Sequence, residues 1–177
     1  MTRVPRTLIV LVEDKPGVLT RIASLFRRRA FNIESLTVGH TEVPGISRMT
    51  IVVDEEDDAA ARIVSYLYKL VNVIQVEDLS EMPSVQRDLA LIKVSTTPEN
   101  RSEIMQLVEV YRARVVDVTN NSLMVEITGD EDKINSFIEL FRPLGIIEMA
   151  RTGAVAMSRG ATSVLADKNH KLSKASI

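Results

Sequence analysis

Seven consecutive residues carry the groups best suited to bind a small charged ligand: Glu13-Asp14-Lys15-Pro16-Gly17-Val18-Leu19. They lie between an apolar run and a helical pattern. Because Gly17 has no side chain, a ligand can approach the backbone closely at the helix start. The free N–H groups and the dipole of that helix favour a small anion, and Asp14 could accept a hydrogen bond from an ammonium group. These groups together would suit the two ends of a zwitterionic amino acid.

The same residues also fit a simpler interpretation. Pro-Gly is an ordinary turn pair, and an aspartate shortly before a helix is a common N-cap. Turns of this kind are frequent, so the stretch alone leaves both interpretations open.

The turn is predicted to join a strand to a helix within a βαββαβ unit. Residues 7–13 are rich in β-branched side chains, and apolar residues from Val18 to Phe26 recur at helical spacing. The pair Pro44-Gly45 separates two further strands, and an acidic stretch opens a second helix. The expected elements are strands 7–13, 31–41, 46–53 and 72–79, a helix over 18–29, and a helix from the acidic stretch to Leu70.

The order of elements then repeats. Thr97-Pro98 is expected to start one helix as N-cap and first residue, and Asp130 is expected to cap another, which Pro143 and Gly145 end. Asn120-Asn121 tolerates positive φ and suits a hairpin turn. The expected strands of this second half are 88–95, 113–119, 122–128 and 146–150.

The predicted fold class is therefore α+β, with two ferredoxin-like βαββαβ domains in tandem. We expect the first domain over residues 1–80, a polar linker over 81–86 and the second domain over 87–160. Residues 161–177 have no periodicity and are predicted to form a flexible tail.

Composition excludes several classes of protein. The net charge of −2 argues against a general nucleic-acid binder and against attraction to an anionic membrane. The absence of cysteine removes disulfides, thiolate metal sites and a cysteine nucleophile, and the two histidines, His40 and His170, leave no multi-histidine metal centre. No apolar run approaches the roughly 20 residues of a membrane span, and no signal-peptide core precedes Glu13. We expect a cytoplasmic protein without a catalytic or metal site.

The first strand carries an unusual pattern, because Leu8 to Val12 is apolar at every position. Both helices of a βαββαβ unit lie on one face of its sheet, so a strand that is apolar on both faces needs a second cover. A partner sheet, domain or subunit is the favoured source of that cover. A tolerant surface is the alternative, since single exposed apolar residues are normal.

Two charged runs are more simply structural. Arg27-Arg28-Arg29 could bind phosphate or a partner, but basic residues are favoured at the end of a helix by its dipole. The acidic stretch Asp54–Asp58 could bind a cation, but acidic residues are favoured at a helix start for the same reason.

The chain resembles a known family at several independent places. Residues 12–38, VEDKPGVLTRIASLFRRRAFNIESLTV, resemble the amino-terminal ACT domain of the regulatory small subunit of acetolactate synthase, also called acetohydroxyacid synthase. Ser47-Arg48-Met49-Thr50 and Lys69-Leu70-Val71 fit the same domain. Further stretches look like that family's second domain, and the resemblance covers roughly residues 4–160. Those stretches are Leu91-Ile92-Lys93-Val94, Val116-Asp117-Val118-Thr119, and Ala150-Arg151-Thr152-Gly153 through Ser158-Arg159-Gly160.

The resemblance implies a subunit with no active site of its own. In that family the small subunit binds a catalytic large subunit that carries thiamine diphosphate, Mg²⁺ and FAD, and this chain would bind no cofactor. The enzyme is a transferase that makes 2-acetolactate from pyruvate on the route to valine, leucine and isoleucine. The small subunit raises its activity and confers feedback inhibition by valine or another branched-chain amino acid.

The resemblance also implies an effector site between the ACT domains of a homodimer. The effector carboxylate would meet the N–H groups of Gly17 and Val18, in a pocket lined by Val18 and Ile33, and any side chain at residue 17 would intrude on the ligand. One chain would contribute Asp14, Lys15, Pro16, Gly17 and Val18, with Thr20 one turn into the helix, and the neighbour would contribute Asn32 and Ile33 at the start of strand two.

Two residues depart from the family pattern. Many members have asparagine at the position of Asp14, and a carboxylate there attracts an ammonium group but repels a carboxylate. Many also have glycine at the position of Ala30. A glycine after a helix usually adopts the left-handed conformation, which is costly for alanine, so the helix is expected to end differently here.

Three other functions can be compared with the residues. An RNA-binding module of the same element order needs aromatic side chains on its central strands, and residues 7–13 and 46–53 contain none. A stand-alone enzyme needs a nucleophile with its base, a metal cluster or convergent acids, and the sequence shows no such group. An ACT-domain amino-acid sensor that serves a different enzyme or regulator remains as the alternative function.

Overall fold

The computed structural model describes residues 4–161 except residue 56. The chain forms two compact units. Of the described residues, 4–85 and 154–161 form the first unit, and 86–153 form the second unit.

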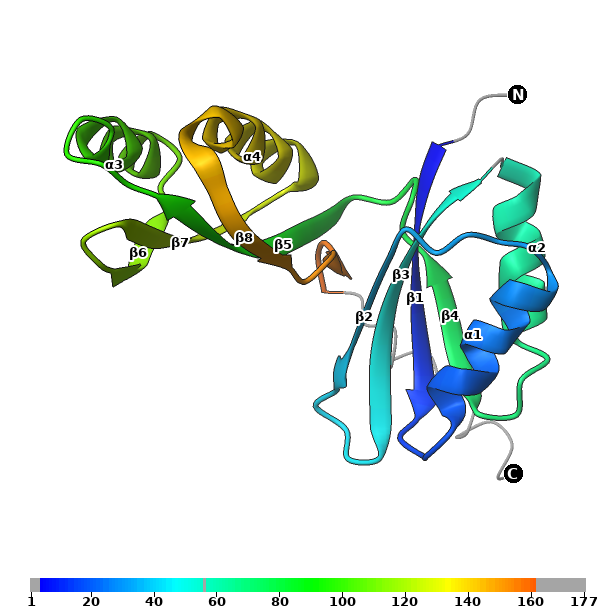
Figure 1. Ribbon diagram of the computed structural model, residues 1–177. Coiled ribbons are helices and arrows are strands. Elements are labelled where there is room, and N and C mark those ends of the chain that lie inside the picture. Colours follow the sequence, from blue (N-terminus) through cyan, green and yellow to red (C-terminus); the bar gives the residue numbers. More distant parts are fainter. Residues whose placement is uncertain (1–3, 56, 162–177) are drawn as a thin grey trace. The chain divides into compact units, whose positions relative to one another are not determined.

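A four-stranded antiparallel sheet with two helices on one face forms the first unit (Figure 1). Its strands lie in the order β2-β3-β1-β4. Because β1 is central, the turn that follows it leads from the middle of the sheet into the first helix. The elements are β1 (Val4–Glu13), α1 (Val18–Arg28), β2 (Ser35–His40), β3 (Ile46–Glu55), α2 (Asp57–Leu67) and β4 (Val73–Asp78).

The second unit repeats this arrangement. Its strands lie in the order β6-β7-β5-β8, again antiparallel. The elements are β5 (Ser84–Ser95), α3 (Arg101–Val110), β6 (Arg114–Val118), β7 (Ser122–Gly129), α4 (Glu131–Gly145) and β8 (Ile146–Arg151). A short strand, β9 (Val155–Ser158), follows and pairs with β5. Both units have the βαββαβ order, so the predicted fold class is confirmed.

Alternation along β1 fixes which side chains meet the helices of the first unit. Leu8, Val10 and Val12 are almost fully buried and pack against Ile22 and Phe26 of α1. Burying each such side chain contributes about 1.5–3 kcal/mol relative to leaving it exposed. This packing holds α1 against the central strand and so fixes the position of the turn between them.

The opposite face of β1 is covered by the chain itself. Ile9 and Leu11 are fully buried there, in a separate cluster with Leu79 of the β4–β5 connection and Ala156 of β9. The sequence favoured a partner as the source of this cover. That expectation is corrected for Ile9 and Leu11, because the chain returns after the second unit and lays β9 on this face.

Hydrogen bonds from the first sheet hold the returning segment in place. Thr37 Oγ1 donates to the carbonyl oxygen of Ala154 at 2.7 Å, and Ser35 Oγ accepts from the Ala154 N–H at 3.1 Å. Arg48 Nη2 donates to the carbonyl oxygen of Ala156 at 2.8 Å. Burial lowers the pKa of Arg48 below its ordinary value, although the carboxylates of Glu77 and Glu42 oppose the shift.

Several predicted boundaries differ from the structure. Residues 84–86, expected in the linker 81–86, already belong to β5, and residues 154–160, expected in the second domain, belong to the first compact unit. The expected tail, 161–177, lies outside the described residues beyond residue 161. No helix of the described part is long and apolar enough to cross a membrane.

Two helix starts show opposite outcomes. Asp130 caps α4 as predicted, because its carboxylate accepts from the Lys133 N–H at 3.0 Å. Helix α3 begins at Arg101, three residues later than expected, since Thr97 and Asn100 bond to each other in a turn. Pro143 does not stop α4, which continues to Gly145.

Candidate functional site

The turn between β1 and α1 is built around Gly17. This residue occupies the N-cap position of α1 with φ 83° and ψ −5°, a left-handed conformation that L side chains rarely adopt. No side chain caps the helix, so the simpler interpretation of Asp14 as the N-cap is wrong. A β-carbon built on Gly17 would meet no protein atom within 4 Å, so the backbone conformation requires glycine and the space beside it is open.

The first amides of α1 remain available to a ligand. Val18 N–H makes only a long hydrogen bond of 3.4 Å, to the carbonyl oxygen of Lys15. The N–H groups of Gly17, Leu19 and Thr20 donate to no acceptor within the described part of the chain. The first turn contains no acidic residue. An anion placed here would meet free donors at the positive end of the helix dipole.

A small polar network positions the turn. Asp14 N–H donates to the carbonyl oxygen of Gly45 at 2.8 Å, which ties the turn to the β2–β3 hairpin. Asn72, in the loop before β4, donates through Nδ2 to Glu13 Oε2 at 2.7 Å and accepts from Arg21 Nη1 at 2.9 Å. The end of β1, the start of α1 and the α2–β4 loop are therefore held together at the site.

Two charged pairs border the turn. Asp14 Oδ2 lies 3.3 Å from His40 Nδ1, and Lys15 Nζ lies 3.0 Å from Glu13 Oε2. The side chains of Lys15 and His40 are largely exposed, so these contacts contribute little to stability. The Asp14 carboxylate stays at the surface, where it can attract an ammonium group.

The predicted site residues fall into two groups. Asp14, Lys15, Pro16, Gly17 and Thr20 lie together at the exposed start of α1, and Val18 follows Gly17 with its side chain buried in the core. The Val18 side chain is therefore not available as a pocket wall in this unit, and only its backbone faces the turn.

Asn32 and Ile33 belong to the segment between α1 and β2. Figure 1 shows this segment leaving the end of α1 that lies opposite the turn at Gly17. The 11 residues of α1 span about 16 Å. Asn32 and Ile33 also precede β2, which begins only at Ser35. The Asn32 side-chain amide donates a hydrogen bond to the Glu34 carboxylate. One chain therefore does not bring the two predicted halves of the site together.

The structure brings three further side chains to the turn, beyond the residues predicted to contact the effector. Leu19, at the end of the predicted stretch, exposes an apolar side chain, 44% exposed, directly beside the free amides. His40 and Asn72 contact the turn from distant parts of the chain. No local pattern distinguishes Asn72 from any other loop asparagine, because its role depends on the sheet order that places β4 beside β1.

The acidic stretch Asp54–Asp58 lies partly outside the described residues, since residue 56 and the side chains of residues 57 and 58 are not described. Among the side chains that the structure does describe, no three or more His, Asp or Glu gather closely enough to hold a metal ion.

Comparison with known families and proteins gives a consistent result. Residues 8–75 match the model of the AHAS small subunit-like ACT domain, and residues 87–160 match the model of the small subunit of acetolactate synthase. A probable acetolactate synthase small subunit of Archaeoglobus fulgidus is 55% identical over 154 residues, which is 87% of this chain and 96% of the relative. The acetolactate synthase small subunit of Mycolicibacterium smegmatis is 49% identical over 162 residues, 92% of this chain and 95% of the relative.

A solved structure agrees with these relatives. The crystal structure of an acetolactate synthase small subunit from Thermotoga maritima has a TM-score of 0.84 and 42% sequence identity to this chain. The match covers 90% of this chain and 99% of that one.

Proposed function

The chain belongs to the family of acetolactate synthase small subunits, and from that membership we propose that it activates the thiamine-diphosphate-dependent catalytic subunit and makes it sensitive to valine or another branched-chain amino acid. A catalytic large subunit is its partner, and thiamine diphosphate, Mg²⁺ and FAD belong to that partner in this proposal. The observation that best supports an effector site is the open start of α1, where Gly17 has a left-handed conformation and the first amides are free. A match to the family over both halves of the chain favours this function over an ACT sensor for another enzyme.

In this proposal each end of the amino acid meets a different part of the turn. The carboxylate accepts hydrogen bonds from the free amides of Gly17, Leu19 and Thr20, where the helix dipole adds to the attraction. The ammonium group lies toward Asp14. The exposed side chain of Leu19 offers an apolar contact to the branched side chain. Asp14 therefore acts on the ammonium end, at the cost of some repulsion toward the carboxylate.

A homodimer through the ACT units would complete this site. Strand β2 is an edge strand, and its last residue, His40, lies beside Asp14 of the turn. If two copies align their β2 strands antiparallel, the start of one β2 comes to the end of the other. The partner subunit's Asn32 and Ile33, which precede β2, then approach the turn that they cannot reach within their own chain.

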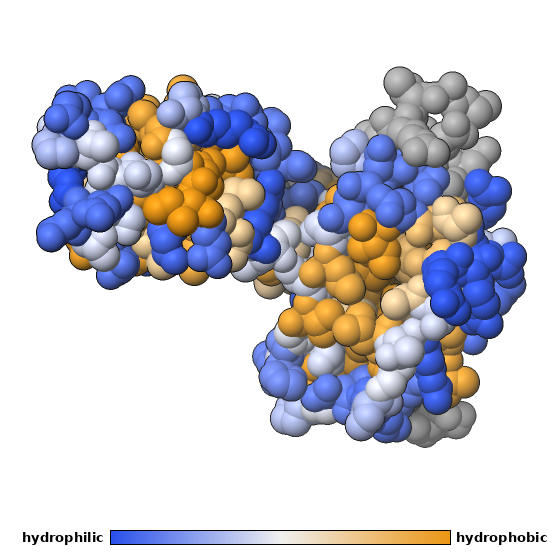
Figure 2. Space-filling model, viewed as in Figure 1, coloured by the Kyte–Doolittle hydropathy of each residue, from blue (hydrophilic) through white to orange (hydrophobic). Residues whose placement is uncertain are grey.

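The second unit offers a surface for the catalytic subunit. Alternation places Ala90, Ile92 and Val94 under the helices, so Leu91 and Lys93 lie on the opposite face of β5. There Leu91, Met124 and Ala150 line a shallow hollow of about 110 Å³, beside the 3.0 Å Lys93–Glu148 ion pair. Apolar side chains also reach the surface elsewhere on the second unit (Figure 2), among them Val116, Ile147 and Met149. A surface of this kind suits contact with another protein.

The effector site can be tested with Gly17→Asp. The new carboxylate stands beside the amides that would bind the effector carboxylate, so we expect calorimetry to show saturable valine binding in the wild type and none in the variant. The reconstituted enzyme should lose valine inhibition while the variant still co-purifies with the catalytic subunit. Gly160→Asp is the matched control, since Gly160 also has positive φ, 91°, and open space around it.

Two results would overturn these assignments. Wild-type valine affinity in Gly17→Asp would remove the turn as the site. Failure of valine, leucine and isoleucine to bind or inhibit, both with the free chain and with the reconstituted enzyme, would remove the proposed feedback function.

Mixing two defective chains tests whether the site is shared between subunits. Gly17→Asp and Asn32→Ala should each bind valine poorly as homodimers. In a mixed dimer one site carries both defects and the other carries neither, so binding should return at one site per mixed dimer. Native mass spectrometry counts the bound valine, and no recovery in a verified mixed dimer would show that each site lies within one chain.

A further inference from the structure

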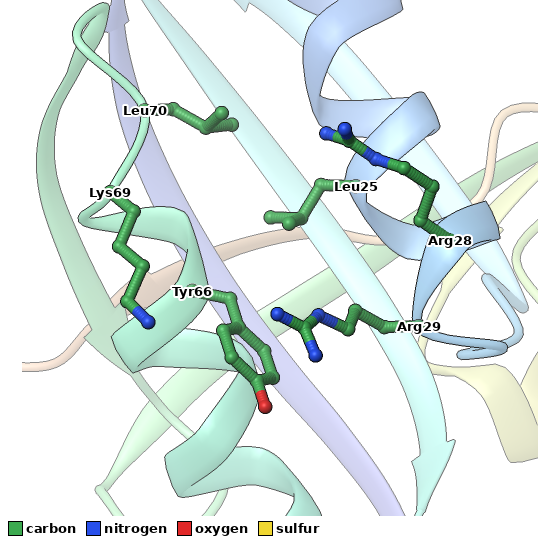
Figure 3. Close-up of a pocket in the computed structure, with 6 residues that line it drawn as sticks. All are labelled: Leu25, Arg28, Arg29, Tyr66, Lys69 and Leu70. Carbon is green, nitrogen blue, oxygen red and sulfur yellow. The ribbon is translucent and has the colours of Figure 1, made fainter.

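Three basic side chains border a groove that the proposed function leaves unused. The groove lies between the ends of α1 and α2 (Figure 3), has a volume of about 380 Å³, and is lined by Leu25, Arg28, Arg29, Tyr66, Lys69 and Leu70. It lies toward the C-terminal end of α1, whereas the effector turn lies at the N-terminal start of the same helix. The groove is therefore separate from the proposed effector site.

The aromatic ring of Tyr66 gathers two of these cations. The guanidinium carbon of Arg29 lies 4.1 Å from the ring centroid, and Lys69 Nζ lies 5.1 Å from the same centroid. Figure 3 shows both side chains directed toward the ring, Arg29 from the end of α1 and Lys69 from the turn that follows α2. Contacts of this kind are weakly favourable at exposed sites and leave the positive charge in place.

No described carboxylate neutralises this group. Within the part of the chain that the structure describes, none of Arg28, Arg29 and Lys69 forms an ion pair. Arg27, in the same helical turn as Arg28, adds a further positive charge nearby. Like charges held together repel one another, so an anion that enters the groove relieves that repulsion as well as forming new contacts.

The shape and lining of the groove indicate the class of anion. Guanidinium groups present planar pairs of donors that match phosphoryl oxygens, and a lysine adds a compact charge. Leu25 and Leu70 supply an apolar surface between the basic groups. A volume of this size falls in the range of small-molecule sites. A phosphoryl group with two negative charges neutralises more of the charge of three cations than a single carboxylate does.

We propose that the groove between α1 and α2 binds a small phosphorylated molecule, with its phosphoryl group held by Arg28, Arg29 and Lys69. The site is independent of the branched-chain effector, so binding there does not require the turn at Gly17.

The test uses inorganic pyrophosphate as the probe and the full chain as the protein. Calorimetry at about 0.15 M ionic strength should show saturable binding that weakens about tenfold or more in Arg29→Gln and in Lys69→Gln. Arg27→Gln is the matched control, because it removes the same charge from the same helix end without lining this groove. It should change the affinity by less than about twofold, since its charge acts only through a screened field.

Three further measurements distinguish a specific phosphoryl site from a diffuse basic surface and from a general anion site. Gly17→Asp should bind pyrophosphate as the wild type does, whatever happens to valine binding. An equal loss in Arg27→Gln would show a diffuse basic surface and overturn the proposal, as would the absence of saturable binding up to about 10 mM. Citrate that binds as tightly as pyrophosphate would overturn the phosphoryl assignment.

Discussion

Individual backbone conformations decide how the helices of this protein begin and end. Gly17 opens α1 with positive φ, and Ala30 follows its end with φ 55°. The Ala30 N–H donates to the carbonyl oxygen of Arg27 at 3.2 Å, and the Phe31 N–H donates to that of Phe26 at 3.1 Å. These two bonds form a Schellman motif, and the rings of Phe26 and Phe31 pack edge to face with centroids 6.3 Å apart.

The expectation that α1 would end differently without glycine is therefore wrong. Hydrogen bonds and the aromatic contact hold Ala30 in the left-handed conformation despite its side chain. Helix α3 ends in the same way, with Arg112 at φ 53° and the Ala113 N–H bonded to the carbonyl oxygen of Val108 at 2.8 Å. Local residue preference is overruled at both places by the packing that follows the helix.

Ala30→Gly should stabilise the first unit. Relief of the left-handed strain, about 1–2 kcal/mol, exceeds the entropy that glycine adds to the unfolded chain, so we expect a gain of about 0.5–1 kcal/mol in the free energy of unfolding. Urea denaturation measures the change. Ala23→Gly, an exposed position inside α1, should instead lose about 1 kcal/mol, and a loss of similar size at residue 30 would contradict the argument.

The amides at the start of α1 show a similar limit of sequence reasoning. The motif around Gly17 located the turn correctly, because glycine at a helix start and a nearby acid restrict the chemistry. It did not reveal that the Val18 N–H bonds back to Lys15 while those of Leu19 and Thr20 stay free. That difference depends on the left-handed φ of Gly17, which the residue type permits but does not require.

At the scale of elements, periodicity predicted the repeated βαββαβ order because each strand and helix is long enough to show its apolar spacing. Strand β9 could not be predicted, since Val155–Ser158 is only four residues long and shows no extended alternation. The apolar pattern of β1 did reveal that a cover was needed for Ile9 and Leu11. It could not reveal that the cover would come from a segment that follows the whole second unit in the sequence.

Ala156→Asp tests the importance of this cover. Ala156 is only 1% exposed and packs in a cluster with Ile9 and Leu11. A carboxylate at this position would lose its hydration and gain an apolar environment in its place. We expect the free energy of unfolding to fall by about 2–4 kcal/mol and the amides of β1 to exchange faster with deuterium. Met157→Asp, the adjacent residue at 62% exposure, should change stability by less than about 0.5 kcal/mol. Equal effects of the two changes would show that β9 does not protect β1.

At the scale of the whole molecule, the first unit is built from two separated stretches of chain. Residues 86–153 lie between them as an insertion, entered at residue 85 and left at residue 154. A simple truncation near Ser84 would therefore remove β9 together with the second unit. If that truncated chain failed to activate the catalytic subunit, the failure would not distinguish an uncovered first sheet from loss of the proposed docking surface.

Excision of the second unit avoids this ambiguity. A chain in which a Gly/Ser linker of about ten residues replaces residues 86–153 keeps β9 and its hydrogen bonds to Thr37 and Arg48. We expect it to dimerise and bind valine but to raise the activity of the catalytic subunit little or not at all. The enzyme assay with added catalytic subunit provides the measurement, and full activation by the excised chain would contradict the division of roles between the units.

The late position of β9 also affects how the chain is made. During synthesis β1 to β4 leave the ribosome first, but the strand that covers Ile9 and Leu11 follows only after the whole second unit. At common elongation rates that interval lasts about 4–16 s. The nascent protein carries an open apolar face throughout this time, and a chain that stops before β9 keeps that face exposed. Closure of the first sheet therefore has to wait for the second unit, and until then chaperones and proteases can reach the face that carries Ile9 and Leu11.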